Sequence, residues 1–172
     1  MTSGTATVIG IMVGIIVAAV FLVLRNRNKE CEYDEMQLKI RARGYQIGFF
    51  TALILMLCLI LLWETGLLTV VTPGFAIYAA LLITVTVFAI YCILHDAFLA
   101  VRGKPNSYIG IFSAVVLLQG AATVRYLMEG EMLENGKLTF SSGSPALMFV
   151  CFLVILITLI VKTVRNGKEA EE

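Results

Sequence analysis

Five long apolar blocks constrain the fold of this chain more than any other feature of its sequence. They cover residues 7–24, 45–63, 75–94, 108–128 and 146–161, and the third could extend to Val101. Each is nearly free of charge in its middle, and about 20 apolar residues let a helix cross the ~30 Å hydrocarbon core of a bilayer. With 59% hydrophobic and 15% charged residues, the chain is more apolar than soluble domains, which are about a quarter charged. We therefore predict an all-α membrane protein with five transmembrane helices.

The basic residues predict how these helices are oriented. A cleavable signal peptide has basic residues before its apolar core, whereas here they follow the first block, as expected for an uncleaved anchor. With the N-terminus outside, residues 25–44, 95–107 and 162–172 lie on the inner side and hold eleven of the 13 Lys and Arg residues. Cytoplasmic loops carry an excess of these residues. We therefore predict an outside N-terminus and an inside C-terminus.

The three prolines mark predicted helix starts. Thr72-Pro73 and Ser144-Pro145 each combine an N-cap hydroxyl with a proline at the first helical position, where the missing N–H costs nothing. Pro105 lies just before the fourth block, with Asn106 or Ser107 as the predicted cap.

The longest outer loop, residues 129–144, contains the turn signal Asn135-Gly136. We expect an ordinary connector here and keep a small outer hairpin as the alternative, because two isolated strands are only marginally stable.

Small residues recur at four-residue spacing in three of the blocks. They are Gly10, Gly14 and Ala18 in the first block, Gly44, Gly48 and Ala52 in the second, and Gly110 and Ala114 in the fourth. Small side chains let transmembrane helices approach closely. We interpret these positions as helix–helix contact faces, within one chain in preference to a homodimer.

Three polar residues lie inside or at the ends of apolar blocks, where polar groups are costly and are functional candidates. Gln119 is in the middle of the fourth block, Arg125 is near its outer end, and Glu64 ends the second block. For Gln119 we favour an interhelical hydrogen bond over a ligand contact. Arg125 can pair with Glu129 one turn on, or with Glu64. The alternative function is a small transporter or channel-like protein whose polar path these three residues line.

Catalytic and metal-binding patterns are weak in this sequence. His95-Asp96 is the one adjacent His and acid and could serve a proton relay, but we favour a simple place at the membrane interface. His95 is the sole histidine, and the four cysteines form no C-x-x-C pair. We expect no cofactor, no metal site and no enzymatic activity.

The most polar stretch, residues 33–45, leads into the second block. Asp34 and Gln37 have the spacing of a capping box, so we predict a helix that starts at Asp34 and runs without a break into the second span. Met36 and Ile40 fall on one face of this helix, and other apolar residues fall on the opposite face. A helix lying on lipid has a single apolar stripe. Met36 and Ile40 are therefore the candidate contacts to a partner.

The same stretch carries a pattern of charges. It reads Asp34-Glu35-x-Gln37, followed by Arg41-x-Arg43-Gly44-Tyr45. The pattern resembles the DE-x-Q…R-x-[KR]-[GA] segment that precedes a transmembrane helix in small uncharacterised bacterial multi-pass membrane proteins. It differs at Met36, where Arg is frequent, and at Gly44, where Ala is frequent. The resemblance implies a bacterial cytoplasmic membrane and brings no activity with it.

These observations favour a non-catalytic integral membrane protein that acts as a structural, accessory or regulatory subunit. Its expected partners are the lipid bilayer and a membrane protein or a second copy of the chain. Nucleic acid is not expected, because membrane orientation already accounts for the basic residues.

Overall fold

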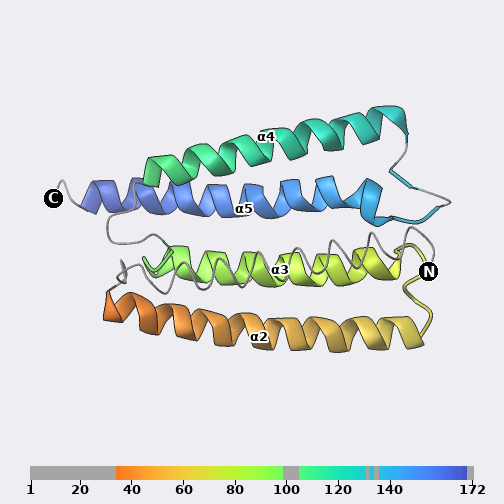
Figure 1. The fold of residues 1–172 in the computed structure, drawn as a ribbon, viewed down its shortest axis with the longest axis horizontal. Helices are drawn as coiled ribbons and strands as arrows, with labels where there is room; N and C mark the ends of the chain where they lie inside the picture. Colours follow the sequence, from red (N-terminus) through yellow and green to blue (C-terminus); the bar gives the residue numbers. More distant parts are fainter. Residues whose placement is uncertain (1–33, 99–104, 131, 134–135, 170–172) are drawn as a thin grey trace, which may run out of the picture. The chain divides into compact units, whose positions relative to one another are not determined.

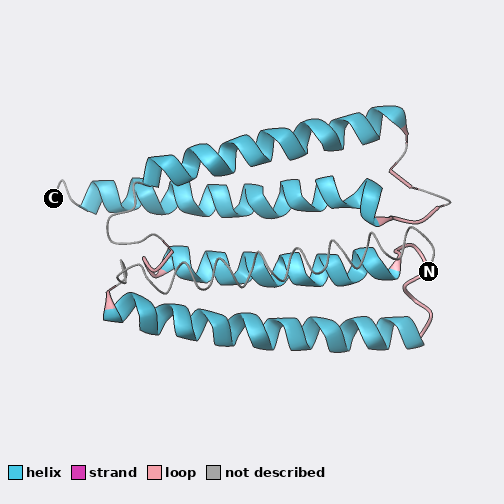
Figure 2. Cartoon of the chain, in the orientation of Figure 1, coloured by secondary structure: helices cyan, strands magenta, loops and turns pink. Residues whose placement is uncertain are grey.

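The computed structural model describes residues 34–98, 105–130, 132–133 and 136–169, and four long α-helices account for most of them (Figure 1). The helices are α2 (Glu35–Glu64), α3 (Pro73–Leu94), α4 (Pro105–Glu129) and α5 (Phe140–Glu169). The described chain is all-helical apart from its loops (Figure 2). Each helix is long and apolar enough to cross a membrane, so the chain has the character of a multi-pass membrane protein. The first predicted block, 7–24, lies outside the described residues.

The four helices lie side by side in a row. Contacts join α2 to α3, α3 to α5 and α5 to α4, and no other pair of the described helices touches. Figure 1 shows the resulting order α2–α3–α5–α4, with the last helix of the chain inserted between α3 and α4. The middle of the row is the better packed part: 28% of the apolar span of α3 is buried, against 6% for α2 and for α4.

Packing in the middle of the row is centred on α3 and α5. The buried cluster consists of Ala89 and Ile93 from α3 and Ile155 and Leu159 from α5. Aromatic residues at the start of α4 and after α3 pack against it, and Phe112 of α4 contacts the Phe152 ring at a centroid distance of 5.9 Å. Along the direction of the helix axes, one end of the row thus holds the start of α2, the end of α3, the start of α4 and the end of α5. We call it the Asp96 end.

The other end of the row, the Leu138 end, is closed by two loops that pair with each other. The Leu138 amide donates to the Val70 carbonyl at 2.7 Å, and the Thr72 amide donates to the Leu138 carbonyl at 3.0 Å. The segment after α4 therefore pairs with the α2–α3 loop. The two segments form an isolated parallel bridge between Val71 and Leu138. The turn of the hairpin considered as an alternative, at Asn135-Gly136, lies partly outside the described residues, so that alternative stays a prediction.

Of the predicted helix starts, one matches in position and two shift. Thr72 and Pro73 occupy the N-cap and first position of α3, but the Thr72 hydroxyl donates to the Leu138 carbonyl and does not cap the helix. The fourth block's helix begins at Pro105 itself. The prediction for Pro145 was wrong: α5 starts at Phe140, and Pro145 lies inside it.

The early start of α5 has a local cause. Thr139 and Ser142 cap it reciprocally: the Ser142 amide lies 3.4 Å from the Thr139 hydroxyl, and the Thr139 amide lies 3.3 Å from the Ser142 hydroxyl. This is the arrangement of a capping box with serine in place of the usual acid. Pro145 is the sixth residue of α5, in its second turn, and cannot donate the helical hydrogen bond to the carbonyl four residues before it.

The third helix ends at Leu94 and does not continue to Val101. Asp96 has a φ of 56°, a left-handed conformation that stops an α-helix and that Asp tolerates better than most residues. The amide of Ala97 then donates to the Cys92 carbonyl at 2.8 Å, which closes the last turn of the helix.

Candidate functional site

Asp96 joins three helices at one end of the row. Its carboxylate accepts an ion pair from the Lys162 ammonium of α5 at 2.8 Å and a hydrogen bond from the Asn166 amide at 3.1 Å. Its main-chain carbonyl accepts a hydrogen bond from the Gln37 amide of α2 at 2.8 Å. The left-handed backbone at Asp96 turns the carbonyl toward one helix and the carboxylate toward the other. In the sequence, Asp96 stands out only as the neighbour of His95, and nothing there pointed to its partners.

His95 does not form a catalytic couple with Asp96. Its Nδ1 lies 2.9 Å from the Tyr91 carbonyl, and its ring is tilted against the Tyr91 ring at a centroid distance of 4.3 Å. The Asp96 carboxylate is instead held by Lys162. The two neighbours thus have separate contacts, and no acid–base relay links them.

The three residues of the predicted polar path do not meet. Glu64 ends α2 at one edge of the row, and Arg125 lies on α4 at the other edge. Arg125 pairs with Glu129 one turn on, with 2.8 Å between Arg125 Nε and Glu129 Oε1, which is one of the two predicted pairings. The Arg125 side chain is 76% exposed. Gln119 is half-buried in the middle of α4. The alternative pairing of Arg125 with Glu64 is excluded by the order of the helices.

The small residues of the second block lie against α3. Gly44 and Gly48 are the buried residues of α2, and a Cβ atom at Gly44 would lie 3.2 Å from the rings of Phe88 and Tyr91. Ala52 is half-buried one turn further.

Gly10, Gly14 and Ala18 lie outside the described residues. Gly110 on α4 behaves differently from the glycines of α2. It is exposed, and no atom lies within 4 Å of the position that its Cβ would take.

The predicted docking residues lie in the first two turns of α2. The helix starts at Glu35 and continues without a break to Glu64, as the sequence predicted. Met36 is 70% exposed, and Ile40 is half-buried. Met36 is thus presented at the Asp96 end of the row.

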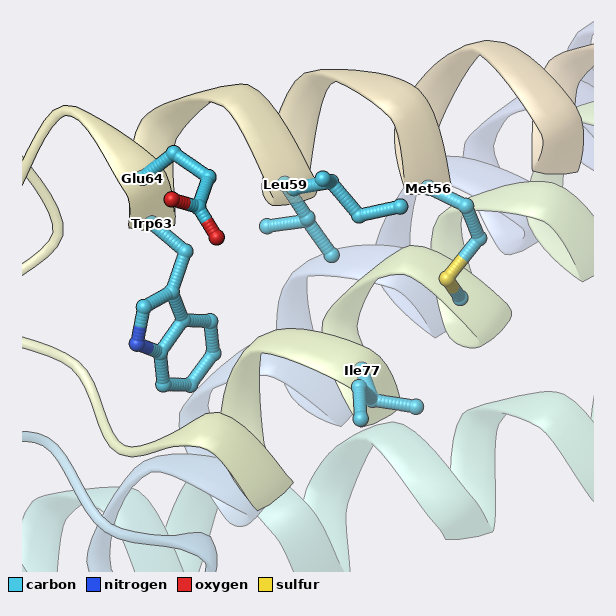
Figure 3. Close-up of a pocket in the computed structure, with 6 residues that line it drawn as sticks. Met56, Leu59, Trp63, Glu64 and Ile77 are labelled. Carbon is cyan, nitrogen blue, oxygen red and sulfur yellow. The ribbon is translucent and has the colours of Figure 1, made fainter.

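Two apolar hollows lie along one side of the α2–α3 pair. The first, of about 220 Å³, is the Gly48 hollow, lined by Tyr45, Gly48, Phe49 and Ala52 of α2 and by Thr84, Val85 and Phe88 of α3. The second, of about 300 Å³, is the Trp63 hollow, lined by Met56, Leu59, Ile60, Trp63 and Glu64 of α2 and by Ile77 of α3. Figure 3 shows the Trp63 ring reaching from α2 toward α3, with the Glu64 carboxylate beside it.

The two hollows share one side because their α2 residues follow one register. They are spaced alternately by four and three residues, as on one face of a helix: Tyr45, Phe49, Ala52, Met56, Leu59 and Trp63. This face could not be recognised from the sequence, because every face of α2 is apolar along its membrane span.

Among the described residues, no group of three His, Cys, Asp or Glu side chains could hold a metal ion together. No protein family, curated protein or solved structure matches this chain.

Proposed function

We propose that the protein is a non-catalytic subunit of the membrane that binds another transmembrane helix along α4. The observation that carries this proposal is a seam on the face of α4 that points away from α5. Its residues are spaced alternately by four and three, and three of them are small: Gly110, Ala114, Leu117, Ala121, Val124 and Met128. All six are exposed, and residues at this spacing form the contact seam of packed helices.

The small residues distinguish this seam from an ordinary lipid-facing surface. Lipid tails cover large apolar side chains as well as protein does, so exposed leucines alone say nothing about a partner. Small residues favour protein because they let two helix backbones approach closely. Gly110, Ala114 and Ala121 do not serve this purpose toward α5, since all three are exposed. A structural, accessory or regulatory role follows from such lateral binding.

The finer membrane arrangement is part of the same proposal. We infer five spans including residues 7–24, an outside N-terminus, an inside C-terminus and a bacterial cytoplasmic membrane. The distribution of charge over the described helices supports it. Six basic residues lie at the Asp96 end of the row, namely Lys39, Arg41, Arg43, Lys162, Arg165 and Lys168, and two lie near the Leu138 end, Arg125 and Lys137. The Asp96 end is then cytoplasmic by the positive-inside rule, and single-cysteine labelling of intact cells at residues 3, 135 and 166 tests it.

A second contact is proposed at the Asp96 end, where Met36 and Ile40 would meet a cytoplasmic element of a partner. The exposure of Met36 supports it. Replacing both residues by serine is expected to weaken a complex without affecting membrane insertion. An unchanged complex on native gels would remove this contact from the proposal.

The experiment that tests the α4 seam compares size variants on two faces. The chain is purified from native membranes in mild detergent, run on native gels, and the co-purifying proteins are identified by mass spectrometry. Ala114→Leu and Ala121→Leu fill the seam and are expected to release the bound protein. Leu118→Phe adds volume outside the seam and is expected to leave the complex intact. A wild-type chain that migrates as a monomer with no co-purifying protein would contradict the proposal.

A further inference from the structure

We propose that the Trp63 hollow binds an acyl chain of phosphatidylethanolamine, and that the Glu64 carboxylate holds the ammonium group of this lipid. The proposal goes beyond the protein partner of α4, because it concerns the α2–α3 side of the row and a lipid ligand. It requires only that the described helices span a membrane.

The hollow has the lining and the length of a site for one hydrocarbon chain. It measures about 300 Å³, and its apolar lining consists of Met56, Leu59 and Ile60 on α2 and Ile77 on α3. From Met56 to Glu64 the α2 wall is about 12 Å long at the rise of an α-helix. One half of the hydrocarbon core is ~15 Å thick. The hollow therefore accommodates the part of an acyl chain that lies in one leaflet.

The two polar side chains of the lining lie at one end of the hollow. Figure 3 shows the Glu64 carboxylate beside the Trp63 ring, and the indole nitrogen lies on the edge of the ring that is turned away from Leu59. Glu64 is the last residue of α2, so this end of the hollow meets the headgroup region, where tryptophan is commonly found. The hollow thus has an apolar length and a polar mouth, as a site for a lipid requires.

The mouth of the hollow carries an unneutralised negative charge. No described residue forms an ion pair or a hydrogen bond with the Glu64 carboxylate. The last turn of α2 contains no basic residue, so the partial negative charge of the helix C-terminus adds to that of Glu64. By contrast, Glu129, which lines a hollow on α4, is bound by Arg125 at 2.8 Å. Glu64 is therefore the carboxylate that attracts a cation from the membrane.

The combination of a carboxylate, an indole and an apolar wall selects an amine-bearing phospholipid. An ammonium donates charge-assisted hydrogen bonds to a carboxylate and is also attracted to the face of an indole ring. Trp63 is 42% exposed, so its Nε1–H is accessible to donate to the lipid phosphate. Phosphatidylglycerol has the same phosphate and tails but carries no cation, so Glu64 repels it. The expected preference is for phosphatidylethanolamine.

The test is native mass spectrometry of the full chain in mild detergent, with phosphatidylethanolamine or phosphatidylglycerol of identical acyl chains added. The wild type is expected to retain one phosphatidylethanolamine under conditions that strip phosphatidylglycerol. Glu64→Gln is expected to weaken phosphatidylethanolamine binding about threefold, the effect of one exposed ion pair. Glu64→Lys is expected to make phosphatidylglycerol the better retained lipid. Glu129→Gln is the matched control and is expected to change neither lipid, because Arg125 already occupies the Glu129 carboxylate.

Two leucines test the position of the acyl chain. Leu59 lines the hollow, whereas Leu61 is 65% exposed and does not line it. Leu59→Phe fills the hollow and is expected to reduce retention of phosphatidylethanolamine. Leu61→Phe makes the same change in volume and is expected to leave the lipid bound.

Equal retention of the two lipids by the wild type would overturn the proposal. So would an unchanged lipid preference in Glu64→Lys, and this variant decides the question even where Leu59→Phe does not fold, because Glu64 is exposed at the last position of α2. Equal losses in Glu64→Gln and Glu129→Gln would also contradict it, since the lipid would then respond to charge at this end of the protein and not to the Trp63 hollow. None of these results bears on the protein partner of α4, so the two proposals fail separately.

Discussion

The carboxylate of Asp96 and the ammonium of Lys162 lie 2.8 Å apart and fasten the end of α3 to the last turns of α5. The pair is only partly shielded, with 60% of the Asp96 side chain and 21% of the Lys162 side chain exposed. Such a pair contributes little by itself. Its position matters more than its strength, because the same residue also accepts a hydrogen bond from α2.

Replacing Asp96 by glycine or by alanine separates the ion pair from the backbone at this position. Asp96→Gly keeps a residue that adopts a φ of 56° freely, so only the side-chain contacts are lost, at a cost of roughly 1 kcal/mol or less. Asp96→Ala also forces alanine into the left-handed region, which adds about 1 kcal/mol. The free energy of unfolding, measured by SDS titration in mixed micelles, is expected to fall further for alanine. Equal losses would show that the backbone conformation carries no cost.

Gly44→Ala and Gly48→Ala are expected to have opposite effects although both glycines belong to one G-x-x-x-G motif. At Gly44 the new Cβ would lie 3.2 Å from the rings of Phe88 and Tyr91, and Phe88 is held by stacking on Tyr45. Overpacking of this kind costs roughly 1–3 kcal/mol. At Gly48 the nearest atoms lie at 3.8 Å, an ordinary contact, and alanine is the better helix former by up to about 1 kcal/mol. The same SDS titration measures both, and effects of one sign would refute the assigned packing.

Thr139→Val removes the hydroxyl that caps α5 and is expected to cost about 1 kcal/mol. Thr158→Val is the control, since the Thr158 hydroxyl donates only to the Val154 carbonyl of its own helix at 2.8 Å. Hydrogen exchange at the amides of Ser142 and Gly143 locates the effect, because fraying at the start of α5 raises exchange there first. Faster exchange throughout α5 in the Thr158 variant as well would show that the cap is not the cause.

Arg125→Gln is expected to change the free energy of unfolding by less than about 0.5 kcal/mol. The Arg125–Glu129 pair is exposed and lies within a single helix, where such pairs contribute little. Glu129→Gln should match it in size, and the double variant should show no coupling beyond that amount. A loss above about 1 kcal/mol in Arg125→Gln alone would mean that Arg125 makes a stabilising contact besides the one with Glu129.

Local features of this fold were predictable from the sequence. The unbroken α2, the position of Thr72 and Pro73 at the start of α3, and the Arg125–Glu129 pair each depend on residues within one or two turns. Capping, proline geometry and side-chain spacing act at that range. The prediction that the last helix starts at Pro145 was wrong because Thr139 and Ser142 cap α5 earlier in the chain.

The order of the helices and the contacts of Asp96 were not predictable. In a soluble protein the apolar face of a helix shows which side is buried. Here lipid makes every face apolar, so the sequence does not distinguish the side of α2 that meets α3 from the side that meets lipid. The Gln37–Asp96 hydrogen bond spans 59 positions, and only the finished arrangement brings the two together. The hollows were missed for the same reason.

The row of helices has a consequence for passage of solutes. A layer one helix thick encloses no interior, and each described helix touches at most two others. The four described helices therefore form a wall and not a tube. A water-filled route past Gln119 or Arg125 would need a further surface opposite this wall, and the four described helices do not supply one.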